Sequence, residues 1–282
     1  MGVTAEALTV VGAPQVGVTV TGLDPGDESV ISVDVSWDGG GTWHGVRGAQ
    51  RVERTGSAFF RDYVPPLNMP ATYRVVVHEG SAIPDPAEDT VTVFSDTAWI
   101  QDPLNPRGAV AIDAQFDTGG TAWLLSSTSS TITRLQNADV VMVEGSRYPT
   151  ASVGQRQVAS QVPVTIRAAA AQGELVRSLR ALFDSAGQLV LRGMHQDCPL
   201  DPVAHVVAGT IVEAPKDGGR YGVHNTWDLV VDQVRPSSLR VAIPFWTYDQ
   251  VAALWAGMSY DTVLAARPGD TYLDWLRSPE VP

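Results

Sequence analysis

The sequence predicts a mainly β protein: a small N-terminal β-sandwich, then a larger β-sandwich or barrel with one flanking helix, and a short helical C-terminal tail. Three observations support this fold class. Short segments of alternating apolar and polar residues recur through residues 1–245. The 26 Gly and 19 Pro are spread along the chain and mark many turns. One longer segment, Gly173–Asp184, instead has the apolar spacing of an amphipathic helix.

Residues 1–95 are expected to form an immunoglobulin-like or fibronectin-III-like β-sandwich. In Val30–Trp37, apolar side chains at every second position predict a strand with one buried face. Trp37 and Tyr73 are the expected core aromatics, and the glycines that follow Trp37 indicate a hairpin. The expected strands are Leu8–Val11, Val16–Val20, Val30–Trp37, Ala49–Glu53, Ser57–Arg61, Thr72–His78 and Thr90–Phe94.

Residues 96–108 are expected to be a linker between two domains. Pro103 and Pro106 lack the N–H group that a strand ladder needs, so this segment is predicted to be extended and fairly stiff. Trp99 is expected to pack into one of the two domains.

Residues 109–245 are expected to form the larger β-domain. The helix at Gly173–Asp184 carries its apolar residues on one stripe, and Gly187 marks its end. A single helix beside many strands indicates a mainly-β or α+β arrangement. The expected strands are Ala109–Phe116, Ala122–Ile132, Val140–Val143, Val162–Ala168, Leu189–Gly193, Val203–Glu213 and Thr226–Val234.

Residues 246–282 contain a short internal repeat. Tyr248, Tyr260 and Tyr272 recur every twelve residues, each directly after a Ser or Thr. In each unit this Ser or Thr can cap a short helix. Such helices are too short to be stable alone in water, so the segment must pack on something. This C-terminal arm either folds onto its own domain or docks on a neighbouring subunit, and the sequence leaves both alternatives open.

Charge and cysteine content exclude several classes of protein. The chain has 19 Lys and Arg against 31 Asp and Glu, a net charge of −12, which argues against a protein that wraps nucleic acid. The acidic surface suits simple solubility, or the wall of a channel through which DNA slides. Cys198 is the only cysteine, so no intrachain disulfide is possible. The N-terminus lacks the pattern of a signal peptide, and no apolar stretch is long enough to span a membrane.

The sequence contains no recognisable catalytic motif. There is no Gly-x-Ser-x-Gly elbow, and a phosphate-binding Walker loop is excluded because Lys216 is the only lysine. Asp113, Asp117 and Asp139 could supply paired carboxylates for sugar hydrolysis, but nothing in the pattern brings two of them together. The protein is therefore expected not to be an enzyme, and no catalytic residue is assigned.

Two groups of residues have part of the chemistry of a metal site. His195, Cys198 and His205 are zinc-type ligands, but their spacing matches no common zinc pattern and a fourth ligand is not obvious. An acidic turn could bind Ca²⁺ but lacks the ligand spacing of a known loop. That turn contains Asp85, Glu88 and Asp89. Solvated loops are the favoured interpretation of both groups, so no metal ligand, cofactor-binding residue or cofactor is expected.

The eight tryptophans allow a carbohydrate-binding platform as one interpretation. Trp in strands more often packs in a core or an interface, and this is the favoured interpretation. The eight are Trp37, Trp43, Trp99, Trp123, Trp227, Trp246, Trp255 and Trp275.

Four features of residues 96–282 follow one another in a characteristic order. The joint Trp99–Pro106 is followed by a strand–helix–strand unit made of Val162–Ile166, the helix at Gly173–Asp184 and Gly187–Gly193. Thr226–Pro236 then forms a closing strand, and the tyrosine repeats end the chain. In these features the chain resembles minor tail proteins of siphophages, in particular proteins of the distal-tail type.

The resemblance implies a structural component of a bacteriophage tail tip, located in the virion after synthesis in the host cytoplasm. It implies a homo-oligomeric ring, expected to be a hexamer, that joins the tail tube protein to other tail-tip or baseplate proteins. Phage DNA would pass through the lumen without specific binding, and no membrane insertion is expected. Neighbouring subunits would join by pairing open strand edges around the central hole.

The same resemblance suggests which strands line the hole. The candidates are Ala122–Ile132 and Val203–Glu213, and the small, uncharged residues from Ser126 to Thr131 suit a wet lumen. The N-terminal sandwich would lie outside and contact other tail proteins or the host envelope. The alternative is that the protein acts as a carbohydrate-binding or host-surface-binding accessory module of the tail.

Overall fold

The computed structural model shows a mainly β protein. It describes residues 1–8, 12–80, 83–116, 122–142, 144–195, 198, 200–216, 223–237, 255–259 and 261–262. Residues 1–240 form one compact unit and residues 241–282 form a second. Among the described residues there is one α-helix, and it does not have the length and apolar character needed to cross a membrane.

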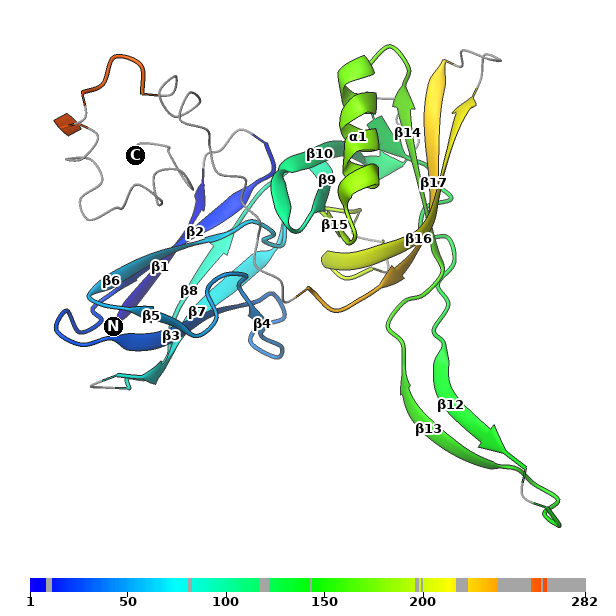
Figure 1. Cartoon of the computed structure of the whole chain (residues 1–282), viewed down its shortest axis with the longest axis horizontal. Helices are drawn as coiled ribbons and strands as arrows, with labels where there is room; N and C mark the ends of the chain where they lie inside the picture. Colours follow the sequence, from blue (N-terminus) through cyan, green and yellow to red (C-terminus); the bar gives the residue numbers. More distant parts are fainter. Residues whose placement is uncertain are drawn as a thin grey trace. The chain divides into compact units, whose positions relative to one another are not determined.

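The N-terminal part of the first unit consists of two sheets that enclose one apolar core (Figure 1). One sheet has the order β1 (Gly2–Leu8), β2 (Gln15–Thr21), β6 (Ser57–Asp62). The other has the order β4 (His44–Gly45), β3 (Ser29–Ser36), β7 (Pro70–Glu79), β8 (Ala87–Thr92), with β5 (Val52–Arg54) also paired to β3. The expected β-sandwich is thus confirmed as a two-sheet structure. Its first strand, β1, lies before the expected strand Leu8–Val11, of which residues 9–11 are outside the described residues.

The sandwich core follows the alternation seen in the sequence. Ile31 and Val33 on β3 and Tyr73 on β7 are fully buried, because side chains at every second position of a strand point to one face. The prediction that Tyr73 is a core aromatic is confirmed. Trp37 lies at the margin of the core, where it is half-buried.

The second part of the unit is a closed barrel. Its strands are β9 (Thr97–Asp102), β10 (Asn105–Phe116), β11 (Ala122–Leu124), β14 (Val162–Ala169), β15 (Leu189–Arg192), β16 (Val203–Lys216) and β17 (His224–Gln233). They close in the order β10-β11-β14-β17-β16-β15-β9. Only the β10–β11 pair is parallel among the described pairs of this barrel. Helix α1 (Gly173–Ser185) packs on the barrel core through Val176, Leu179 and Leu182, as its apolar spacing predicts.

The expected linker at residues 96–108 is largely strand. Thr97–Asp102 is β9, and β10 starts at Asn105, so this segment belongs to the barrel. Pro103 lies in the turn between the strands, and Pro106 lies where the β9–β10 register shifts, which is where a strand tolerates the loss of an N–H donor. The prediction that Trp99 packs into a domain is confirmed, since it packs against the sandwich core.

The expected long strand Ala122–Ile132 is wrong beyond Leu124. Residues 126–129 form turns, and Thr128 donates its hydroxyl to the carbonyl of Thr165 while its own Oγ1 accepts the Thr165 N–H. Ser and Thr side chains compete with the backbone for hydrogen bonds, and here they replace the ladder. Residues 125–132 therefore do not form the strand that was expected to line the central hole.

The expectation that the larger β-domain leaves its strand edges open is also wrong for the barrel. The barrel strands pair with one another within a single chain. The exception is the outer half of β16, since residues 207–216 pair only with β17 in the described part of the chain. A free edge for strand pairing with a neighbour is therefore left at the outer half of β16, which overlaps the expected ring strand Val203–Glu213, rather than around the barrel as a whole.

A two-stranded hairpin leaves the barrel between β11 and β14 (Figure 1). It is made of β12 (Gln136–Val141) and β13 (Thr150–Arg156), which pair with each other and with no other described strand. The sequence predicted a strand at Val140–Val143, but not this hairpin; Val143 lies outside the described residues. We refer to residues 134–158 as the projecting hairpin.

Little of the C-terminal arm falls within the described residues. Tyr248, Tyr260 and Tyr272 lie outside them. In the second unit, the hydroxyl of Ser259 accepts a hydrogen bond from the backbone N–H of Thr262 at 3.2 Å, which is the capping contact that the repeat predicts.

Candidate functional site

The junction between the sandwich and the barrel is held by a buried arginine. Arg192, the last residue of β15, is fully buried. Its Nη1 donates to the carbonyl of Pro65 at 3.1 Å and its Nη2 to the carbonyl of Pro14 at 2.9 Å. Its Nε donates to Oε1 of Gln101 at 3.1 Å. One barrel side chain therefore binds two sandwich loops and a neighbouring barrel strand.

A buried carboxyl group lies near this arginine. Asp62 accepts hydrogen bonds from the Tyr73 hydroxyl at 2.8 Å and from the Val64 N–H at 2.9 Å. Burial raises the pKa of Asp62, while these two hydrogen bonds and the charge of Arg192 oppose the rise. Burial lowers the pKa of Arg192 to about 10, and Asp62 opposes that change. The two charges thus compensate each other inside the protein.

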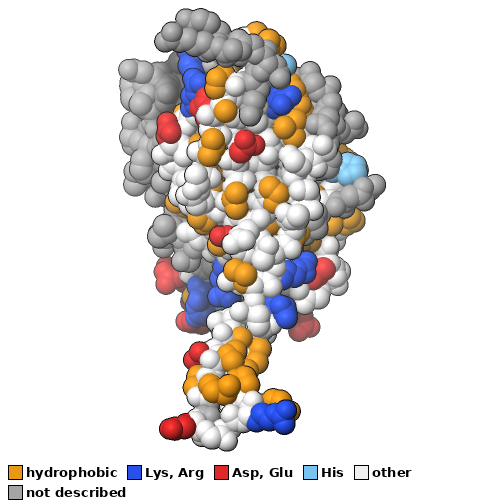
Figure 2. Space-filling view, turned by 90° about the vertical axis from the view of Figure 1, so that its right-hand side faces the viewer, with side chains coloured by type: hydrophobic (Ala, Val, Ile, Leu, Met, Phe, Trp, Pro, Cys, Tyr) orange, Lys and Arg blue, Asp and Glu red, His pale blue; other side chains and the backbone are white. Residues whose placement is uncertain are grey.

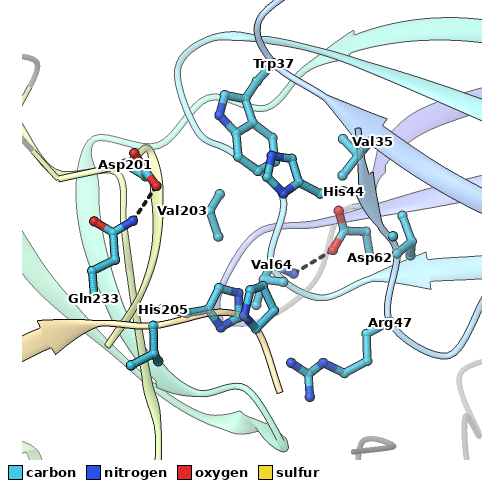
Figure 3. Close-up of a pocket in the computed structure, with 14 residues that line it drawn as sticks. Val35, Trp37, His44, Arg47, Asp62, Val64, Asp201, Val203, His205 and Gln233 are labelled. Atoms are coloured by element: carbon cyan, nitrogen blue, oxygen red, sulfur yellow. Dashed lines mark hydrogen bonds between the residues drawn. The ribbon is translucent and has the colours of Figure 1, made fainter. Parts of the chain in front are cut away.

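A small cavity opens beside this junction (Figure 3). Its volume is about 100 Å³, and residues of both the sandwich and the barrel line it. On the sandwich side, Trp37 and His44 stack with ring centroids 4.2 Å apart. On the barrel side lies His205 of β16, which is buried and whose Nδ1 has no hydrogen-bond partner among the described residues. Burial, together with the nearby Arg47 and His44, lowers the pKa of His205 to about 4.

The structure does not assemble the metal sites that the sequence raised as candidates. No group of three metal-binding side chains occurs within the described ranges. The Cys198 N–H donates to the carbonyl of His195 and its Sγ lies 3.4 Å from the Ser129 hydroxyl, whereas His205 lines the cavity. The expected acidic turn is partly strand, since Glu88 and Asp89 lie on β8, and Asp89 accepts the backbone N–H of Ala5 at 2.8 Å.

The candidate carboxylates for sugar hydrolysis lie on different elements. Asp113 is on β10 of the barrel and Asp139 is on β12 of the projecting hairpin. Asp117 lies outside the described residues.

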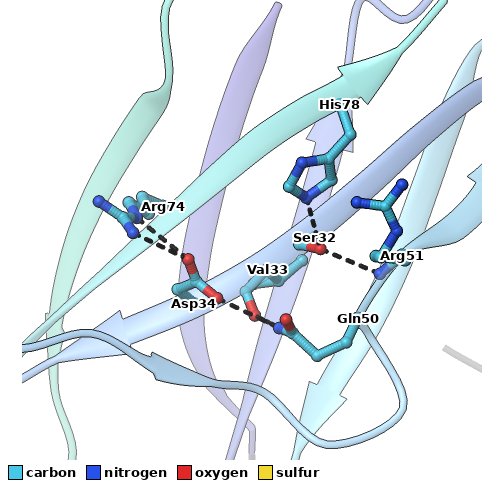
Figure 4. A network of polar contacts seen from close by, with 7 residues as sticks. All are labelled: Ser32, Val33, Asp34, Gln50, Arg51, Arg74 and His78. Atoms are coloured by element: carbon cyan, nitrogen blue, oxygen red, sulfur yellow. Dashed lines mark hydrogen bonds and ion pairs between the residues drawn. The ribbon is translucent and has the colours of Figure 1, made fainter.

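The outer face of the five-stranded sheet carries a polar network (Figure 4). Arg74 donates from Nε and Nη2 to Oδ2 of Asp34, at 3.1 and 3.0 Å. Gln50 donates to the Val33 carbonyl, and Ser32 contacts both His78 and the Arg51 N–H. This network joins strands β3 and β7 to the segment around β5.

The tryptophans of residues 1–237 pack against the protein. The Arg74 guanidinium lies 3.9 Å from the Trp43 ring centre, so it covers one face of that ring. Trp37 stacks on His44, and Trp123 and Trp227 are buried. These contacts fit the interpretation of tryptophan as packing better than that of a carbohydrate platform.

The projecting hairpin has one apolar face. In its register, Ala138 lies opposite Val153 and Val140 lies opposite Ala151. Residues directly opposite in an antiparallel pair point to the same side, so these four side chains share a face. Val140 is 59% exposed and Val153 is 64% exposed. Figure 2 shows the hairpin beyond the rest of the unit, with hydrophobic side chains gathered on it.

The other face of the hairpin is more polar. Asp139 lies opposite Ser152, and Val141 lies opposite Thr150. Every residue of β13 is exposed, so the described chain covers neither face. We call the side formed by Ala138, Val140, Ala151 and Val153 the apolar hairpin face.

The base of the hairpin is tied to the barrel. Thr133 and Ser160 form an antiparallel bridge, and the Ser160 hydroxyl donates to Asp232 of β17. The Gln161 N–H donates to the same carboxylate at 2.8 Å. These two hydrogen bonds lower the pKa of Asp232. The hairpin therefore starts from an anchored position although its strands extend beyond the barrel.

A second exposed apolar surface lies on the outer side of β16 and β17. Val207, Val212 and Val230 are 37%, 51% and 52% exposed. Along β17 the exposed Asp228, Val230 and Asp232 alternate with buried residues, and Val207 and Val212 pair opposite the two aspartates. We call the surface of Val207, Val212 and Val230 the valine face.

Sequence reasoning missed the projecting hairpin and the junction arginine. The hairpin has a signal in the sequence, since Asp139 separates Ala138 from Val140, and Ser152 separates Ala151 from Val153. Arg192 has none, because its role depends on distant loops.

Comparison with protein-family models gives no match, and comparison with curated proteins gives none either.

Proposed function

We propose that the protein is a non-enzymatic, self-assembling structural subunit that forms a ring in the tail tip of a siphophage. In this proposal the ring is an adaptor between the tail tube and the tip or baseplate. The N-terminal part is an immunoglobulin-like or fibronectin-III-like module, and the barrel with its hairpin corresponds to a distal-tail-type domain. The observation that carries the proposal is the uncovered apolar hairpin face.

An uncovered hairpin of this kind favours assembly for a simple physical reason. An isolated two-stranded hairpin is marginally stable in water and needs a further strand or a packed face. Among the described strands, β12 and β13 pair only with each other, and the side chains of Val140 and Val153 are more than half exposed. Contact with another chain would both bury these valines and hold the strands together.

A hairpin that reaches a neighbour also favours a closed ring. The hairpin and any surface that receives it are different parts of the chain, so the contact is heterologous. Heterologous contacts repeat from copy to copy and close when the rotation fits. The net charge of −12 suits a lumen that DNA must pass without binding. Tail location and neighbouring tail proteins rest on the sequence resemblance described above.

The proposal is tested by the mass and shape of the purified full chain. We expect a concentration-dependent assembly of one defined size, seen as rings in electron images. Val153→Asp should prevent it, because a charge on the apolar hairpin face cannot be buried without a partner. Thr150→Asp, on the other face of the same strand, is the matched control and should still assemble. A wild-type chain that stays monomeric at every concentration contradicts the proposal.

A further inference from the structure

We propose that the apolar hairpin face of one copy packs on the valine face of the next copy. This inference rests on the proposed function and names the contact that would join neighbouring subunits. Because both contacting surfaces are named, the contact would be wrong if a ring formed through other surfaces.

The two surfaces match in form. Each is a face of a β-sheet that presents valines from two neighbouring strands: Val140 and Val153 on one, Val212 and Val230 on the other. Sheet faces pack on each other when their side chains interdigitate at a spacing of about 10 Å. Valine is compact and stiff at χ1, so such a contact costs little side-chain freedom.

The two surfaces also differ in charge. The projecting hairpin contains three Arg and two acidic residues, a net charge of +1, although the whole chain carries −12. The rest of the chain therefore carries −13. Asp228 and Asp232 flank Val230 on this surface, and their carboxylates already accept hydrogen bonds from Thr165 and from Ser160 and Gln161. A weakly basic hairpin is thus attracted to the acidic body of a second copy, and salt would weaken that attraction.

The contact is between copies, not within one. The strands of the hairpin are exposed in the single chain, and so is Val230, so neither surface covers the other. The hairpin is anchored at Ser160 next to Asp232, on the strand that carries Val230, and its strands extend away from this point. The valine face of the same chain is therefore left open for another hairpin.

Paired cysteines test the contact directly. Val140→Cys and Val230→Cys are made in separate chains, both with Cys198→Ser, mixed, and oxidised mildly. The matched control replaces Val140→Cys by Asp139→Cys, one residue away on the opposite hairpin face. We expect the 140–230 mixture to give several-fold more disulfide-linked dimer than the 139–230 mixture. Equal yields from the two mixtures would overturn the proposed contact.

A charge substitution gives an independent measurement. Val230→Glu should abolish assembly while the circular dichroism spectrum stays that of a folded chain, because the side chain is exposed in the monomer. Phe94→Glu is the control for an exposed apolar residue elsewhere, since Phe94 is 79% exposed in the sandwich part. If Val230→Glu still forms rings, the valine face is not the receiving surface, but the proposed function stands. If the wild-type chain forms no ring, both proposals fall.

Discussion

The sandwich–barrel junction buries a charged side chain, whereas the projecting hairpin exposes apolar side chains. At the junction, the charged guanidinium of Arg192 is removed from water and receives partners from both parts of the same chain. On the hairpin, the apolar side chains of Val140 and Val153 remain exposed, and no described residue covers them. The junction is thus completed within one chain, whereas we propose that a second molecule covers the exposed valines of the hairpin.

Removing the junction arginine should have the largest effect on stability. Arg192→Ala leaves two loop carbonyls without this donor and removes from Asp62 the stronger of its two nearby positive charges, the other being Arg47. We expect the free energy of unfolding to fall by about 3–5 kcal/mol, as for other buried pairs that lose one partner. Denaturant unfolding measures this.

An exposed arginine provides the control for that measurement. Arg180 pairs with Glu213 at the surface, and Arg180→Ala should cost no more than about 1 kcal/mol. If the two variants lose similar stability, the junction is not the tightly satisfied contact that we describe.

Acid should weaken the junction through His205. The pKa of His205 is lowered to about 4 in the folded protein, against 6.5 as its ordinary value. As the pH falls, His205 is therefore protonated at a higher pH in the unfolded chain than in the folded protein. The contribution to stability is complete above pH 6.5 and decreases progressively between pH 6.5 and 4, by about 2–3 kcal/mol in total.

Comparing the wild type with a His205→Phe variant separates the effect of His205 on stability from that of the other titrating groups. Stability is measured against pH for the wild type and for His205→Phe, and only the wild type should lose stability from this source. Parallel pH curves for the two chains would show that His205 is not buried in its neutral form.

A charge placed on the apolar hairpin face should have the smallest effect on monomer stability, but it should abolish assembly. Val140→Asp changes an exposed side chain, so the unfolding free energy of the dilute monomer should change by at most about 0.5 kcal/mol. The same variant should not assemble, because the apolar hairpin face would carry a charge. A loss of several kcal/mol in the monomer would mean that the face is already buried within the chain.

The sequence predicted those features that depend on local patterns. Ile31 and Val33 alternate with polar neighbours, and the strand and its buried face follow directly. The apolar stripe of α1 and its packing on the barrel follow in the same way. The hairpin was missed because a strand was expected only at Val140–Val143, without a partner, although Val153 lies directly opposite Ala138.

Other features depend on contacts that no local pattern contains. Arg192 reaches a carbonyl 178 residues away in sequence, and the segment Leu189–Gly193 predicts only a strand. The linker expected from Pro103 and Pro106 became strand because the barrel provides a turn and a register shift that accommodate the two prolines. The Ser and Thr residues after Leu124 form turns because Thr128 bonds to the backbone of β14.

Hydrogen exchange of the hairpin amides at low and high protein concentration tests most directly whether a second copy covers this surface. We predict fast exchange for residues 138–141 and 150–153 in dilute solution, and slow exchange once the protein assembles. The amides of β3, inside the sandwich, should exchange slowly in both states. Assembly without any slowing at the hairpin would contradict the account.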